Sequence, residues 1–177
     1  RDKMVTGVQT CALPISLPDG RTVAELLIEG NAATGEKIEV RRVARVTGER
    51  VVAYLHKTSR DLPAQIGVLL ATSGGDEEIA HDVAMHVAAF SPTVLARADV
   101  PADVVANERH IAEATAREEG KPEAALPRII EGRVNGYFKE NVLLEQAFAK
   151  DQKKSVAQVL KEAGAEATGF ARFRVGN

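Results

Sequence analysis

The chain has 177 residues, enough for one good core or for a core with an appendage, and its 45% hydrophobic and 27% charged residues are typical of a folded globular protein. A formal net charge of −2 at pH 7 excludes a general electrostatic attraction to nucleic acid or to an anionic membrane. The apolar runs at residues 66–71 and 83–90 are far shorter than the roughly 20 residues of a membrane-spanning helix. We therefore expect no nucleic acid and no membrane as a partner.

Residues 1–16 differ in character from the rest of the chain. They lack hydrophobic periodicity and the apolar centre of a signal peptide, and residues 5–15 resemble the translation of a common sequencing adapter. We treat 1–16 as a non-native segment and leave it out of the fold prediction. This also removes Cys11, the only cysteine, which excludes disulfides, cysteine-ligated zinc and a thiol nucleophile and favours an intracellular, cytoplasmic location.

The following residues predict a short capped helix. A turn at residues 18–20 leads to Thr22, a good N-cap, and Gly30 and Gly35 are expected to end the helix.

Residues 38–46 alternate as in a β-strand, but Arg42 falls in the apolar register. Either a bulge or an edge position turns Arg42 outward, or its side chain is buried and paired, because a buried unpaired guanidinium is too costly. A hairpin turn at residues 47–50 then leads to a second strand, 51–56, which ends at His56.

The central part of the chain predicts a strand, a glycine turn and a helix, the scaffold of the fold. Residues 66–71 form the strand, Gly74 and Gly75 the turn, and Asp76 opens the helix. Its apolar face carries residues at i, i+4, i+8 and i+11, namely Ile79, Val83, Val87 and Phe90.

Two helices of similar length follow, at residues 99–119 and 122–140, joined by a Gly-Lys-Pro turn. The first has a narrow apolar stripe, so the pair is predicted to form an antiparallel arm that protrudes from the sheet domain. Two ordinary helices covering the sheet are the alternative.

The C-terminal part is predicted to run extended along the surface at 142–150, to form a helix capped by Ser155, and to return as a fourth strand at 166–175. The fold class is therefore α+β: a mainly antiparallel three- to four-stranded sheet packed by helices, with the helical arm inserted. We expect one core domain from residues 17–98 and 142–177, with 99–141 as the inserted arm.

The histidines do not form a metal-ligand set. His81 and His86 are five positions apart, about 140° in helical projection, and His110 lies on the arm. We expect His86 to be a packing histidine. His56 ends a strand beside a polar loop and is either a surface residue or a functional one.

No sequence pattern predicts catalysis. Residues 72–76 lack the lysine of a P-loop and the third glycine of a dinucleotide fingerprint, and no nucleophile elbow occurs. We therefore expect a binding protein rather than an enzyme, with no catalytic residue, cofactor or metal.

Several segments, in this order along the chain, carry a family resemblance: residues 35–38, 41–44, 53–56, 65–69, 79–89, 118–122, 130–133, 156–162 and 168–173. Over about residues 17–177 the sequence resembles bacterial translation elongation factor Ts. The segments 84–89 and 168–175 are the most specific.

The resemblance implies a guanine-nucleotide exchange factor that binds the GTPase elongation factor Tu, loosens GDP and magnesium, and lets GTP reload. The resemblance also implies that the factor itself breaks no covalent bond during nucleotide exchange. The arm corresponds to the family's coiled-coil protrusion, the core is of the family's dimerisation type, and a homodimer through the core or the arm is compatible with the resemblance.

The resemblance also implies partner-binding residues. His56, at the end of the strand with Tyr54, matches a family histidine that contacts the nucleotide-binding domain of the partner. Phe148, Ala149 and Lys150 match a surface segment that touches the partner's third domain. Alanine replaces the flanking proline and valine of the family pattern here, so we expect a smaller contact.

The family's N-terminal helical domain and its Thr-Asp-Phe-Val motif do not occur in this sequence. We expect a truncated reading frame of a longer gene, whose product binds elongation factor Tu weakly and exchanges nucleotide poorly. The alternative function is an RNA-associated or structural module, indicated by basic residues on adjacent predicted strands: Arg41, Arg42, Arg45 and Arg50.

Overall fold

The computed structural model describes residues 15–175, so residues 1–14, most of the adapter-like segment, lie outside the described part. The chain divides into two compact units, with the boundary after Arg45. Each unit is described by itself. The domain limits expected from the sequence remain a prediction.

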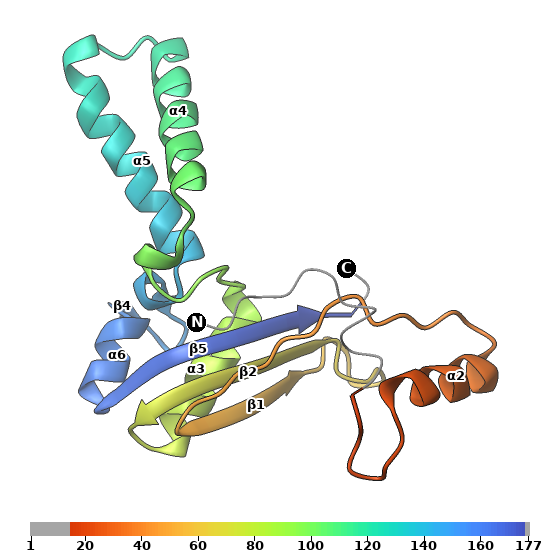
Figure 1. Ribbon diagram of the computed structural model, residues 1–177. Helices are drawn as coiled ribbons and strands as arrows, with labels where there is room; N and C mark the ends of the chain where they lie inside the picture. The colour runs from red at the N-terminus through yellow and green to blue at the C-terminus, as the bar shows by residue number, and fades with distance from the viewer. Residues whose placement is uncertain (1–14, 176–177) are drawn as a thin grey trace. The chain divides into compact units, whose positions relative to one another are not determined.

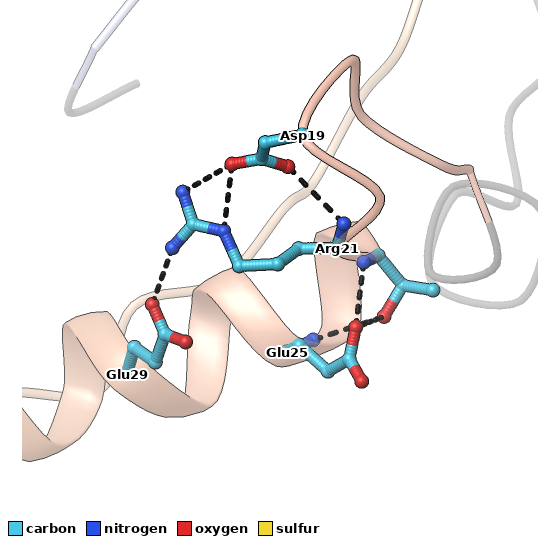
Figure 2. Close-up of polar contacts among 5 residues, drawn as sticks. Asp19, Arg21, Glu25 and Glu29 are labelled. Carbon is cyan, nitrogen blue, oxygen red and sulfur yellow. Dashed lines mark hydrogen bonds and ion pairs between the residues drawn. The ribbon is translucent and has the colours of Figure 1, made fainter.

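The first unit contains helix α2 (Val23–Thr34), which begins at the predicted cap. The Thr22 hydroxyl accepts a hydrogen bond from the Glu25 amide, and the Glu25 carboxylate accepts one from the Thr22 amide, which forms a capping box. The helix ends at Gly35, at a φ of 70°, whereas Gly30 lies inside it and does not end it. Figure 2 shows Arg21 between the carboxylates of Asp19 and Glu29.

The strand predicted for residues 38–46 is not formed, and no strand of the described residues pairs with this segment. The prediction is wrong because alternation alone does not make a strand, which requires a neighbour to take its backbone hydrogen bonds. Arg42 is exposed, neither bulged nor buried. Residues 47–50 consequently form no hairpin turn.

The second unit is built on an antiparallel sheet, called the main sheet below. Within the described residues it has three strands, β1 (Arg50–His56), β2 (Ile66–Gly74) and β5 (Ala165–Arg174), in the order β1-β2-β5. Helix α3 (Glu77–Phe90) contacts all three strands and lies on one face of the sheet (Figure 1).

Helix α3 is capped by Asp76, whose carboxylate accepts from the Ile79 amide. Val83 and Val87 are fully buried as predicted, but Phe90 is 48% exposed because the helix ends there, where Ser91 takes a φ of 53°. The core between helix and sheet contains Val68, Leu70, Val83 and Val87, joined by Leu143, Phe148, Val156 and Leu160 from the C-terminal part.

The predicted arm is a helical hairpin. Helices α4 (Ala102–Glu118) and α5 (Leu126–Asn141) run antiparallel (Figure 1) and contact each other. A separate apolar cluster, Val100, Val134, Phe138 and Val142, closes the base of the hairpin. Two short 3₁₀ turns, η1 (Arg97–Asp99) and η2 (Glu123–Ala125), precede α4 and α5.

The segment after the hairpin corrects a further expectation. The sequence predicts an extended surface segment at residues 142–150, but these residues include the 3₁₀ turn η3 (Leu143–Glu145) and strand β3 (Ala147–Phe148), which pairs with β4 (Asp151–Ser155). Val142 and Leu143 are fully buried because their apolar side chains join the two cores. Helix α6 (Val156–Glu162), capped by Ser155 as predicted, leads into β5. The α+β fold class is confirmed, with a three-stranded main sheet in the described residues.

Candidate protein-binding site beside helix α3

Strand β1 directs Tyr54 and His56 to the face of the main sheet that α3 covers. Side chains alternate along a strand, so residues 54 and 56 share a face. The Tyr54 hydroxyl and His56 Nδ1 form a 3.1 Å hydrogen bond, and the Tyr54 ring meets His81 of α3 edge to face, with centroids 5.4 Å apart. Both residues are half-buried, and His56 Nε2 makes no hydrogen bond within residues 15–175. Its orientation is thus set while one ring nitrogen remains available.

The second set of predicted residues, Phe148, Ala149 and Lys150, divides into a buried part and an exposed part. Phe148 is only 4% exposed and packs in the core. Ala149 and Lys150 are exposed. The Lys150 ammonium forms a 2.6 Å ion pair with Asp82 of α3, which holds the end of this segment against the helix.

His86 is fully buried, and the prediction of a packing histidine is confirmed. Its ring stacks on Phe90, with centroids 4.6 Å apart. Nδ1 accepts a hydrogen bond from the Ala149 amide at 3.2 Å, and Nε2 lies 2.9 Å from Oε1 of Gln146. Burial lowers the pKa of His86, although the hydrogen bond to Gln146 acts in the opposite direction.

Helix α3 contacts both predicted sets of residues. His81 contacts Tyr54, whereas Asp82 and His86, one turn apart, hold Lys150 and Ala149. Sequence reasoning missed Asp82 and Gln146. The i, i+4 spacing of Asp82 and His86 indicates that the two side chains lie on the same side of the helix and could have been used to predict a joint role. No local sequence pattern predicts the role of Gln146, because its hydrogen-bond partners lie on α3 and α5.

The basic residues behind the alternative RNA-associated function do not lie on adjacent strands. Arg41, Arg42 and Arg45 belong to the strandless segment of the first unit. Arg50 begins β1, and its guanidinium donates to the carbonyls of Gly74 and Gly75 at 3.2 and 2.9 Å. Arg50 therefore stabilises the glycine turn.

Within residues 15–175, no three histidine, cysteine, aspartate or glutamate side chains gather as metal ligands. In the same part of the chain, none of the helices has the length and hydrophobicity of a membrane-spanning segment.

Comparison with known proteins gives a consistent match. The family model described as Elongation factor TS matches residues 5–177. Elongation factor Ts of Renibacterium salmoninarum is 65% identical over 161 residues, which cover 89% of this chain and 58% of that protein. The proteins of the same name from Kocuria rhizophila and Acidothermus cellulolyticus are 63% and 64% identical, again over 89% of this chain. The chain thus spans a little under three fifths of the length of these curated relatives.

Proposed function

This chain belongs to the elongation factor Ts family, and on that premise we propose that it binds elongation factor Tu and promotes the release of GDP during translation elongation in the cytoplasm. The observation that carries the proposal is the family match over residues 5–177, together with 65% identity to a curated member. The protein acts by binding alone and breaks no covalent bond. Its partner is a protein, with no nucleic acid, membrane, metal or cofactor required.

Exchange of this kind is a negative coupling between two ligands of the GTPase. The coupling free energy is the same in both directions: the factor weakens GDP binding to the GTPase by the same amount by which GDP weakens binding of the factor. The factor therefore needs rigid contact groups, since groups that first have to be ordered lose part of their binding free energy.

Two contact groups meet this requirement. The first is His56, oriented by Tyr54, which in turn packs against His81. The second is the exposed pair Ala149 and Lys150, held on α3 by hydrogen bond and ion pair. We assign Phe148 the role of a buried anchor beneath this second group, because its side chain packs in the core.

The 177-residue chain is proposed to be a weak exchange factor. Ala149 offers little apolar area, and the Lys150 charge is already paired with Asp82. The sequence also contains no Thr-Asp-Phe-Val motif, the family element expected near the magnesium and phosphates.

The exchange proposal is tested by stopped-flow release of a fluorescent GDP analogue from elongation factor Tu, with residues 17–177 added at increasing concentration. We expect a measurable acceleration well below that of a relative containing the motif. No acceleration together with no binding in a direct titration would refute the function. Full-strength acceleration would refute the proposed impairment.

A second copy of this chain is proposed as a further partner, through the face of the main sheet opposite α3. The paired positions there carry apolar residues or glycine, with Leu55 71% and Val51 42% exposed. Sedimentation of the wild type and of Leu55→Lys tests this, since the variant places a charge on that face. A wild type that is monomeric at high concentration would exclude the homodimer through the core.

A further inference from the structure

A chain of buried and partly buried hydrogen bonds joins helix α3 to the end of α5 and to the segment that follows it, about 60 residues further along the sequence. It runs from the Ala149 amide to His86 on α3, from His86 to Gln146, and from the Gln146 amide nitrogen to the carbonyl of Glu140 on α5, at 2.6 Å. The same nitrogen lies 3.5 Å from the carbonyl of Phe90, at the end of α3. The exposed segment 149–150, helix α3 and the base of the hairpin thus meet at one polar junction.

The donors and acceptors at this junction permit one arrangement. A backbone amide only donates, so His86 Nδ1 has to be the unprotonated acceptor, and the proton of the neutral ring lies on Nε2. Nε2 then donates to Oε1 of Gln146, whose two amide hydrogens point to the two carbonyls. Both side chains are nearly or fully buried, and all of their polar groups are used.

We propose that His86 and Gln146 are positioning residues that fix the Ala149–Lys150 contact group on α3 and tie it to the base of the α4–α5 hairpin. The partner-binding part of this statement rests on the proposed function. Neither residue touches the partner, because both are buried. They act by directing the Ala149 amide inward, so that the following Lys150 reaches Asp82.

Simple filling of the core does not account for the junction. An apolar side chain of similar volume would fill the space without any cost of burying polar groups, whereas a hydrogen bond adds a direction. In this junction the hydrogen bond to His86 fixes the orientation of the peptide group at residue 149, where the exposed contact group begins.

Three substitutions of His86 separate the two hydrogen bonds. In His86→Asn, the amide oxygen lies near the position of Nδ1 and can still accept from Ala149. In His86→Gln, the longer amide places its nitrogen near Nε2 and retains only the bond to Gln146. His86→Leu removes both bonds. Val83→Ala serves as the control for lost core packing, because it removes buried apolar contacts of α3 in the cluster that includes Phe148 and removes no hydrogen-bonding group of the junction.

The first measurement is hydrogen exchange of the Ala149 amide, followed by NMR in the full chain. We expect slow exchange in the wild type, His86→Asn and Val83→Ala, and exchange at least about tenfold faster in His86→Gln and His86→Leu, from the loss of one hydrogen bond. Unchanged exchange in His86→Gln and His86→Leu would overturn the positioning role.

The second measurement is the affinity for elongation factor Tu by titration of the same proteins. We expect roughly fivefold to tenfold weaker binding in His86→Gln and His86→Leu and near-normal binding in His86→Asn. Weakening that follows stability, with Val83→Ala as affected as His86→Leu, would overturn the proposal. A wild type that does not bind at all would refute the proposed function. In that case, hydrogen exchange of the Ala149 amide would still test whether His86 fixes the Ala149–Lys150 segment on α3.

Discussion

The ring of His86 and the backbone amide of Ala149 lie 63 positions apart in the sequence, yet Nδ1 of the one accepts a hydrogen bond from the other at 3.2 Å. This contact ties the exposed segment before β4 to the central helix of the fold. It also requires a neutral imidazole, because a protonated Nδ1 would face another donor.

The first prediction concerns pH. Burial lowers the pKa of His86 in the folded state from its ordinary value of 6.5. The unfolded chain therefore binds more protons as the pH falls through about 6.5, and the stability due to the neutral ring is lost progressively from that pH downward. Urea unfolding between pH 7.5 and 5 should show a steeper loss for the wild type than for His86→Leu. The neighbouring residues Asp82 and Lys150, an ion pair in the wild type, are present in both proteins, which differ in sequence only at position 86. Parallel pH profiles would contradict the prediction.

The second prediction concerns the base of the hairpin. The Arg97 guanidinium hydrogen-bonds both carboxylate oxygens of Glu145 and lies 4.3 Å from the centroid of the Phe138 ring. Arg97→Lys keeps the positive charge but loses the bidentate hydrogen bonding to Glu145, and it should reduce the free energy of unfolding by about 1 kcal/mol. Arg109→Lys is the control, since its contact with Glu131 is a single exposed one that should contribute less than about 0.5 kcal/mol. Equal losses of unfolding free energy in the two variants would contradict the prediction that the Arg97–Glu145 contact stabilises the fold more than the Arg109–Glu131 contact does.

The third prediction concerns the glycine turn after β2. Gly74 has a φ of 63°, and a Cβ there would lie 2.4 Å from the carbonyl oxygen of Gly164. Gly74→Ala should therefore destabilise by more than about 3 kcal/mol, because backbone strain and a steric clash add. Gly120 has a similar φ of 68° but open space around it, so Gly120→Ala should cost only about 1 kcal/mol. Thermal unfolding of both variants measures the difference.

The fourth prediction concerns Thr72 in β2. Its side chain is 1% exposed, and its hydroxyl has no hydrogen-bond partner among the described residues. Thr72→Val replaces the hydroxyl with a methyl group of similar size and should stabilise the fold by about 1 kcal/mol. Thr72→Ser keeps the hydroxyl, loses the methyl and should destabilise. Denaturant unfolding that ranks serine above valine would contradict this interpretation.

The fifth prediction concerns His56 in the proposed exchange function. His56→Ala should slow GDP release from elongation factor Tu roughly tenfold at a subsaturating concentration of the factor, while unfolding changes little, because the side chain is only half-buried. His110→Ala, an exposed change on α4, provides the control. Equal release rates for the two variants would remove His56 from the contact surface.

Local signals in the sequence predicted the elements that depend on near neighbours. The Thr22 cap, the Asp76 cap with its acidic first turn, and the Gly-Lys-Pro break at residues 120–122 each act within a few residues of the helix they delimit. The packing of His86 followed in the same way from its place beside the apolar stripe of α3.

Predictions that required distant residues succeeded less well. The alternation at 38–46 is real, but a strand needs a partner to pair with, and no strand in the described residues pairs with it. The family resemblance predicts Phe148 to lie in a surface segment, yet its side chain packs among core residues such as Val83 and Leu160, which are remote in the sequence or in the next helix.

The sequence by itself thus determined the family, the α+β class and most of the helix boundaries, since periodicity, caps and motifs are properties of short stretches. Only the tertiary structure decided that Phe148 is buried in the core while Ala149 and Lys150 are exposed, and that α3 contacts both proposed contact groups. The physical reason is that burial and hydrogen-bond pairing depend on which distant side chains the fold brings together, here Asp82 and His86 with a segment more than 60 residues further along.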